Sequence, residues 1–512
     1  MEYGALSLLP PLIAIIIALL TRQTLLSLFI GVWVGSTIIN SWNPFSGFAK
    51  SISDFMIPSI ADPWNASLLI LVSLAGGFIH ILKVTGAAQA FAQVATKKVN
   101  TRRKAQNVTW GSAFLFSYTE PVLILGTIMR PLTDRVKVSR VKLAYILDSM
   151  GAPLASMSPI SSYGPFITGL IATQITALSL TESPWTLFLQ MIPYNLYGIF
   201  AMIGVLYVIN TRLDIGPMYL AEKRAIETGE VIGENDKPLV TSQNSEDFPE
   251  GHVFKFHQFL IPMLLLFATI FTVIFWTGNI AENGFRGSFI KANIVLAISC
   301  GFLAGSIGAG VLSVKSKLHT VKTAFDEFTQ GIINLMIVPM ILVLAWSIGK
   351  ISGKMELGAY MSTIVGDYLP AFIVPALIFL LGSLIAFSTG SSWGVFAIMM
   401  PIAIPMGVSM DISLPLVIGA VISGGLFGDH CSPISDTTIL ASTGAACDHI
   451  EHVRTQLPYA ILIAVCSFLG FLVSGLTAGW LGIITTAVTT FLALYLLNKK
   501  AKSSQKPVNI SV

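Results

Sequence analysis

The sequence has 512 residues, of which 54% are hydrophobic and only 11% are charged, and its mean hydropathy is +0.76. Soluble globular proteins carry about 25% charged residues, so this composition excludes an ordinary soluble enzyme, a disordered chain and a nucleic-acid-binding protein. The net charge is only +4, and in a membrane protein the placement of Lys and Arg matters more than their sum. We therefore expect a polytopic membrane protein, with room for about ten to twelve spans of roughly 20 residues each.

Apolar runs in chain order give the expected spans. They are 5–20, 23–39, 66–84, 143–178 and 185–210, followed by 257–277, 288–312, 331–349, 411–445, 456–477 and 479–498. The first run lacks a basic leader and continues directly into the second, so we expect it to be retained as a span. The polar segment 211–256 separates the two sets and is predicted to be a cytoplasmic linker.

Basic clusters determine the sidedness of the first half. Segments 97–104 and 130–142 are both rich in Lys and Arg, so both should lie in the cytoplasm. The apolar stretch between them, 107–130, must then enter and leave the membrane on the same side. It is predicted to be a re-entrant helical hairpin with its tip at the polar interruption 117–121. A single crossing is the alternative, and it would place one basic cluster outside.

The second half repeats the first at an offset of about 271 residues. LILV (69–72) aligns with MILV (340–343), and after small gaps the motif SPIS at 158–161 aligns with SPIS at 432–435. Each half contains five crossings and one hairpin. Because five is odd, the second half should have the opposite orientation in the membrane, and inverted repeats are typical of secondary transporters.

The predicted fold is therefore an all-α polytopic membrane protein built from two inverted-topology repeats. Its parts are the first repeat 1–210 with hairpin 107–130 and broken helix 143–178, the linker 211–256, the second repeat 257–478 with hairpin 371–401 and broken helix 411–445, and an extra C-terminal helix with a basic cytoplasmic tail over 479–512.

Each half has two interrupted elements, a hairpin tip and a broken helix, which combine hydroxyl residues with Pro or Gly. Pro removes a backbone donor and Gly relaxes the helix, so these segments should be unwound. Free carbonyls and hydroxyls there offer the oxygen ligands that a hard cation such as Na⁺ accepts. Helix packing through small residues is the alternative explanation. The candidate ion- or substrate-binding residues are Ser117, Thr119, Glu120, Ser158, Ser161, Ser162, Ser388, Thr389, Gly390, Ser391, Ser392, Asp429, Ser432, Ser435 and Asp436.

Isolated carboxylates indicate where protons are coupled. Glu120 and Asp148 are each the only charge in the apolar run around them, and Asp429 and Asp436 lie in a run of 99 residues, 355–453, without Lys or Arg. A carboxylate inside a membrane costs several kcal/mol unless it is neutralised. These four acids are therefore the candidate proton-coupling groups, with structural hydrogen bonding as the alternative.

A Na⁺ site is expected at the second hairpin and the second broken helix. Its predicted ligands are Thr389, Ser392, Asp429 and Asp436.

The histidines of the second half carry a weaker signal. His430 lies in a Gly-rich turn and is expected to be structural or gating, although an imidazole can relay protons. His449 and His452 are expected in a solvated cytoplasmic turn, where their spacing would also suit a metal ion.

At these motifs the chain resembles the NhaC-type sodium/proton antiporter family of the ion-transporter superfamily. The matching segments are GTIMRPLTDRVKVSRVKLAYILDS (126–149), SPISSYGPFITGLI (158–171), FSTGSSWGVFAIMMP (387–401) and GDHCSPISDTTILASTGA (428–445). The resemblance implies Na⁺/H⁺ exchange, sometimes linked to organic-acid exchange. It also implies an architecture like that of the divalent-anion/sodium symporters, with a mobile transport domain that holds the hairpins and a scaffold domain through which such proteins form homodimers.

The leading hypothesis is a multi-pass plasma-membrane transporter, not an enzyme and without a cofactor, that exchanges Na⁺ for H⁺ by alternating access. The alternative is a Na⁺-coupled carrier of an amino acid or organic acid. It is supported by Glu120, which stands near the first hairpin tip where the family typically has a cluster of Asp residues. An intramembrane aspartyl protease is a third interpretation, and the internal repeat argues against it. No nucleic-acid partner is expected.

Overall fold

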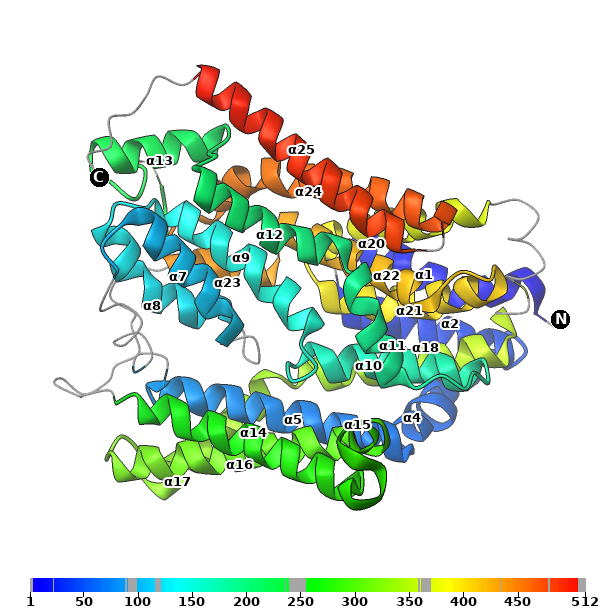
Figure 1. Ribbon diagram of the computed structural model, residues 1–512. Coiled ribbons are helices and arrows are strands. Elements are labelled where there is room, and N and C mark those ends of the chain that lie inside the picture. Colours follow the sequence, from blue (N-terminus) through cyan, green and yellow to red (C-terminus); the bar gives the residue numbers. More distant parts are fainter. Residues whose placement is uncertain are drawn as a thin grey trace.

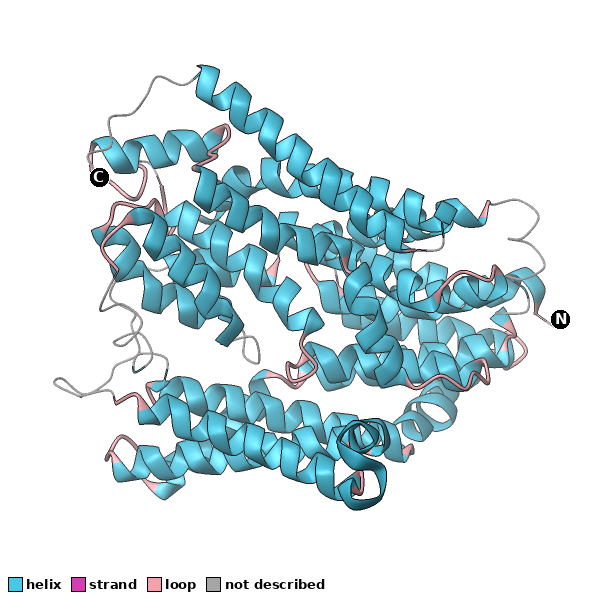
Figure 2. Ribbon diagram, in the orientation of Figure 1, coloured by secondary structure: helices cyan, strands magenta, loops and turns pink. Residues whose placement is uncertain are grey.

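The apolar runs of the sequence form long helices. The computed structural model describes residues 3–21, 23–87, 90, 99–115, 121–234, 236–238, 255–357, 360, 370–433, 435–477 and 479–504. Within these ranges, nine helices are long and apolar enough to cross a membrane, and two bent helix pairs raise the number to eleven. Figure 2 shows helices joined by loops, and the described part of the chain contains no strand. The predicted all-helical polytopic fold is confirmed.

In the described residues, the first half and the linker contain 15 elements. They are η1 (Gly4–Leu8), α1 (Leu9–Thr21), α2 (Thr24–Ile39), α3 (Pro44–Lys50), η2 (Ser51–Met56), α4 (Ile57–Ala61), α5 (Pro63–Val84), α7 (Arg102–Leu115), α8 (Pro121–Arg135), α9 (Arg140–Met157), α10 (Tyr163–Ala177), α11 (Pro184–Met191), η3 (Ile192–Tyr194), α12 (Leu196–Thr211) and α13 (Pro217–Glu227).

The second half follows the same plan and ends with one additional helix. Its elements are α14 (His257–Thr277), α15 (Ile280–Lys291), α16 (Ile294–Lys315), α17 (Val321–Asn334), α18 (Ile337–Lys354), η4 (Ala371–Ile373), α20 (Val374–Thr389), α21 (Ser392–Ser409), α22 (Leu414–Cys431), α23 (Asp436–Ala445), α24 (His449–Thr477) and α25 (Trp480–Ser504).

Corresponding helices of the two halves exchange partners. At the offset of the sequence repeat, α2, α5, α7–α8 and α9–α10 correspond to α16, α18, α20–α21 and α22–α23. α5 packs against α16 while α18 packs against α2, and α8 packs against α23 while α21 packs against α10. This reciprocal packing is expected of two inverted repeats related by a pseudo-two-fold axis. Each hairpin therefore lies against the broken helix of the other half.

Packed helix pairs lie at both predicted hairpins, and both predicted helix breaks are present; that the hairpins are re-entrant stays a prediction. In the second hairpin, α20 and α21 pack on each other and are joined by a tight turn in which Gly390 has a φ of +65°, a backbone conformation that Gly adopts without strain. In the first hairpin, α7 packs against α8, and the tip 116–120 lies outside the described residues. Helix α9 ends before Pro159 and α22 ends before Pro433. The residue before each proline, Ser158 or Ser432, has an extended backbone with a ψ of 118° or 129°, which a following proline favours.

Four helices, α5, α14, α16 and α17, form a layer along one side of the molecule, at the bottom of Figure 1. Within it, α5 and α17 approach closely at two glycines: a Cβ added to Gly76 would lie 2.6 Å from the carbonyl oxygen of Gly331. Small residues allow such close backbone approach in membrane proteins. The sequence did not predict α17 as a separate helix, nor the helices at 44–61. The domain boundaries, and dimerisation through a scaffold domain, stay predictions.

The beginning of the linker is docked onto the helices that flank the first hairpin. Glu222 of α13 is 3% exposed and accepts hydrogen bonds from the guanidinium of Arg102 and, at 2.8 Å, from the backbone N–H of Ser139. Lys142, which is 1% exposed, donates to Asp214 at 2.6 Å. The linker is thus attached to the ends of α7 and α9 by buried charges.

Candidate functional site

The second helix break brings Asp429 to the N-termini of two helices. Its side chain, on the last turn of α22, is buried; Oδ1 accepts a hydrogen bond from Oγ of Ser435, the N-cap of α23, at 2.5 Å. Oδ2 accepts one from the backbone N–H of Ser392, the first residue of α21, at 3.3 Å. Helix N-termini carry partial positive charge and favour an anion. Ser392 and Asp429, two of the predicted Na⁺ ligands, are therefore in contact.

The hydroxyls of the second hairpin tip are bonded to their own backbone. Ser388 and Thr389 donate to the carbonyl of Ile385 at 3.0 and 2.8 Å, and Ser391 caps α21 by accepting from the N–H of Gly394 at 3.4 Å. A hydroxyl that donates one hydrogen bond keeps lone pairs on its oxygen, so Ser388 and Thr389 remain able to ligate a cation next to Ser392.

The helix break and the hairpin tip are tied together. Ser432 Oγ donates to the carbonyl of Phe387 at 2.7 Å, which joins the segment after α22 to the last turn of α20. Glycine makes this approach possible, since a Cβ on Gly428 would lie 2.2 Å from the carbonyl oxygen of Ser383. The unwound backbone and the hairpin tip thus form one unit around Asp429.

The first broken helix reaches this unit through Tyr163, which the sequence analysis did not name. Tyr163 is the first residue of α10; its hydroxyl lies 3.1 Å from Oγ of Ser392. Its ring packs on Trp393 with a centroid separation of 4.2 Å. The position of Tyr163 two residues after the first SPIS motif was the only sequence signal available for it.

The serines of the first break have mainly structural contacts. Ser161 Oγ donates to the carbonyl of Ala155 at 2.6 Å and accepts from the backbone N–H of Tyr163 at 3.1 Å. Ser162 is buried and Ser158 is half-buried. For Ser161 the alternative to an ion ligand, stabilisation of the helix break, describes these contacts best.

Asp148 lies in a second buried polar cluster, formed by α9, α23 and α24. Its Oδ2 accepts hydrogen bonds from Thr438 Oγ1 at 3.0 Å and from Gln456 Nε2 at 2.9 Å, and Nε2 of His452 is 3.8 Å from the same oxygen. His452 is fully buried, so its predicted place in a solvated turn is wrong. Helix α24 begins at His449, seven residues before the predicted span, and its first turns carry His452 into the protein.

A hydroxyl connects His452 with a second histidine. Ser442 Oγ lies 2.9 Å from Nδ1 of His452 and 3.0 Å from Nδ1 of His449, whose Nε2 is 2.6 Å from the carbonyl oxygen of Pro433. His449 is half-buried, at the end of the molecule where Asp448 accepts a hydrogen bond from the linker. Titratable and hydroxyl side chains thus run in a line from near the surface to Asp148.

His430 links three helices beside this cluster. Its Nε2 is 3.1 Å from Ser149 Oγ and its Nδ1 is 2.5 Å from the hydroxyl of Tyr197, while its carbonyl accepts from Gln456 at 2.6 Å. Both ring nitrogens have partners, and His430 lies in the last turn of helix α22 instead of the predicted Gly-rich turn. Its structural or gating role stays a prediction.

The remaining candidates cannot be placed in the site. Ser117, Thr119 and Glu120 lie outside the described residues, as does the side chain of Asp436, whose backbone begins α23. Among the residues that are described, no group of three or more His, Cys, Asp or Glu side chains is arranged to hold a metal ion.

Known proteins with similar sequences identify the class of molecule. A family model described as "Na+/H+ antiporter family" matches residues 154–476. The chain belongs to this family. An uncharacterized protein of Haemophilus influenzae is 35% identical over 508 residues, 96% of this chain and 95% of that protein. The malate-2H(+)/Na(+)-lactate antiporter of Bacillus subtilis is 37% identical over 166 residues, 31% of this chain and 34% of that antiporter.

The fold has a counterpart among solved structures. The YdaH transporter of Alcanivorax borkumensis, described as having an unusual topology, superimposes with a TM-score of 0.58 at 12% identity, over 85% of this chain and 90% of that one. Membership of the antiporter family and the apolar helices together make this protein a multi-pass membrane protein and a secondary transporter.

Proposed function

We propose that the protein exchanges Na⁺ for H⁺ across the plasma membrane, with Asp429 as the group for which the two ions compete. The observation that supports this most is the position of the Asp429 carboxylate between the N-termini of α21 and α23, where it accepts bonds from a hydroxyl and a backbone N–H. H⁺ and Na⁺ each carry one positive charge, so either ion can neutralise the charge of a buried carboxylate. Competition for one carboxylate gives exchange rather than co-transport.

The site is also suited to alternating access. Ser392 contacts Asp429 of its own half and Tyr163 of the other half. A Na⁺ ion bound by Asp429 and the hydroxyls of the hairpin tip would pull α20–α21 toward the break between α22 and α23, and the contact with Tyr163 would pass this change to the first half. An ion that binds two conformations with different affinity shifts their populations.

The cluster around Asp148 supplies the proton in this proposal. The path runs from His449 through Ser442 and His452 to Asp148. Thr438 places this cluster next to the ion site, since its hydroxyl donates to Asp148 at 3.0 Å and lies 3.5 Å from the backbone carbonyl oxygen of Asp429. Histidine suits this task because each of its two ring nitrogens can carry or accept a proton.

The test is flux in proteoliposomes that contain the purified protein. An imposed pH gradient should drive ²²Na⁺ uptake, and Asp429→Asn should abolish it. A matched control is Asp411→Asn, because Asp411 is exposed and its φ of +54° is a conformation that Asn adopts readily. Uptake by Asp429→Asn at the wild-type rate would refute the assignment.

The second candidate function, Na⁺-coupled transport of a carboxylate, is favoured by the name of the Bacillus relative, which combines Na⁺, H⁺ and two organic acids. The same proteoliposomes separate the two functions. Na⁺ flux that occurs only when a small organic or amino acid is present would favour the carrier, and Na⁺ flux driven by the pH gradient alone favours the exchanger.

A further inference from the structure

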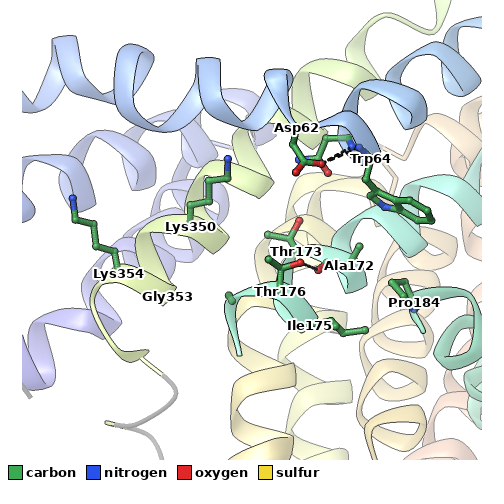
Figure 3. A pocket seen from close by; sticks show the side chains of 12 residues that line it. Asp62, Trp64, Ala172, Thr173, Ile175, Thr176, Pro184, Lys350, Gly353 and Lys354 are labelled. Carbon is green, nitrogen blue, oxygen red and sulfur yellow. Dashed lines mark hydrogen bonds between the residues drawn. The ribbon is translucent and has the colours of Figure 1, made fainter. Parts of the chain in front are cut away.

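A cavity of about 510 Å³ lies where α5, α10 and α18 meet, away from the ion site (Figure 3). On the predicted topology it is at the outer side, at the beginning of α5 and the ends of α10 and α18. α10 and α18 pack tightly just below it, since a Cβ on Gly349 would lie 2.5 Å from Cγ2 of Thr173. The cavity is lined by side chains of these three helices and by Pro184 of α11.

Its wall on α18 carries two ammonium groups one helical turn apart. Lys350 is half-buried, and no hydrogen bond or ion pair joins its ammonium to another residue in the described ranges. Lys354 lies over the ring of Phe55, 5.9 Å from its centroid. One carboxylate, that of Asp62, faces Lys350 across the cavity (Figure 3), and its Oδ1 accepts from the first backbone N–H groups of α5. Lys354 lies farther from Asp62, at the exposed edge of the cavity. The cavity thus carries a net charge of about +1.

These bases stand out against the charge pattern of the whole chain. Lys and Arg favour cytoplasmic loops in membrane proteins, and the two lysines lie on the outer side of the predicted topology. The opposite wall has an apolar part formed by Trp64, Ile175 and Pro184, next to the polar side chains of Asn65, Thr173 and Thr176. An ammonium group in a partly dehydrated cavity favours the binding of an anion. The apolar wall calls for an anion with a short hydrocarbon body.

We propose that this cavity is an outer binding site for a small monocarboxylate, with the carboxylate on Lys350 and Lys354 and the hydrocarbon body against Trp64 and Ile175. One negative charge balances the net charge of the cavity, whereas a dicarboxylate would leave an excess that Asp62 repels. The site touches the end of α10, whose first residue, Tyr163, contacts the hairpin tip about 20 Å away. A ligand here is therefore placed to influence the ion site without occupying it.

The test is thermal unfolding of the purified protein in detergent, titrated with propionate as the choline salt. A ligand that binds only the folded state raises the unfolding midpoint in a saturable way. We expect such a rise with propionate, and none with propionamide, which is uncharged. Lys350→Gln should raise the apparent Kd at least tenfold, and Lys350→Arg, which keeps the charge, should retain most of the binding.

Lys291→Gln is the matched control, because Lys291 is an exposed lysine of the outer side on α15 that lies outside the cavity. If Lys350→Gln does not fold, Lys354→Gln tests the same claim. The proposal is overturned if propionate gives no saturable shift, if propionamide acts equally, or if Lys291→Gln weakens binding as much as Lys350→Gln. It is also overturned if phosphatidylglycerol gives the shift and propionate does not displace it, since the anion would then be a lipid headgroup. The unfolding experiment measures no flux, so its result does not depend on whether the protein exchanges Na⁺ for H⁺.

Discussion

Replacing His452 by Gln separates proton transfer from ion binding. In the structure Nδ1 of His452 lies 2.9 Å from Ser442, and Nε2 lies 3.8 Å from Oδ2 of Asp148. The Gln amide has a similar length and can bond to one of these partners, but it cannot take up and release a proton. Because His452 is fully buried, bulk water cannot reach this position and carry the proton in its place.

The expected loss follows from this geometry. A positioned acid–base group contributes roughly 10²–10⁴-fold to a proton-transfer step. The 3.8 Å between His452 and Asp148 is longer than a normal hydrogen bond, so we take the lower end of that range. Na⁺/H⁺ exchange should fall about 100-fold, which corresponds to about 2.7 kcal/mol in the barrier.

Two fluxes in the same proteoliposomes check this expectation. Uptake of ²²Na⁺ driven by a pH gradient needs the proton step, whereas exchange of ²²Na⁺ for unlabelled Na⁺ at equal pH does not. His452→Gln should lose the first and keep the second, and Thr455→Ser, at another buried position of α24, should keep both. Equal loss of both fluxes would mean that His452 supports the fold alone, and full retention of both would remove it from the proton path.

Three further substitutions test other parts of the structure. Ser435→Ala removes the 2.5 Å hydrogen bond to Asp429. It should raise the half-saturating Na⁺ concentration in ²²Na⁺ uptake about tenfold, since a hydrogen bond to a charged group is worth about 1.5–3 kcal/mol. An unchanged half-saturating concentration would contradict the ion site. Glu222→Ala leaves Arg102 without its buried carboxylate partner and should lower the free energy of unfolding by about 3–5 kcal/mol. The loss should appear as a lower midpoint in thermal unfolding. An unchanged midpoint would show that the docking of the linker adds no stability. Gly76→Ala places a Cβ 2.6 Å from a carbonyl of α17 and should cost about 1–3 kcal/mol; Gly111→Ala, where a Cβ meets nothing within 4 Å, is the control and should leave the midpoint unchanged.

Much of the frame could be predicted from the sequence because it rests on local chemistry. Apolar runs of sufficient length give the spans, and the two SPIS motifs mark the two helix breaks, although other prolines such as Pro153 and Pro401 lie inside helices. The contact between Ser392 and Asp429 was also within reach, because both residues belong to interrupted elements, and in a membrane unwound backbone is tolerated only where protein or a cavity surrounds it.

Other features depend on helix starts and rotations that a hydropathy pattern does not contain. The polar residues 448–456 suggest a loop, yet α24 begins at His449 and the rotation of the helix turns His452 inward while Ile450 is exposed. Tyr163 is one aromatic residue among many in apolar segments, and only the packing of α10 on α21 shows that it reaches Ser392. Tertiary packing, and no local rule, decides these positions.

The two helix breaks show how a symmetric frame holds an asymmetric site. When the SPIS motifs are aligned, Ser435 corresponds to Ser161, and Asp429 corresponds to Ala155. Both serines bond to the residue six positions earlier, but Ser161 reaches the backbone carbonyl of Ala155 while Ser435 reaches the carboxylate of Asp429. The duplicated backbone thus supplies two similar breaks, and one side chain makes one of them anionic. In the proposed mechanism the cation therefore binds at the second break, and the first break contributes Tyr163, which contacts Ser392.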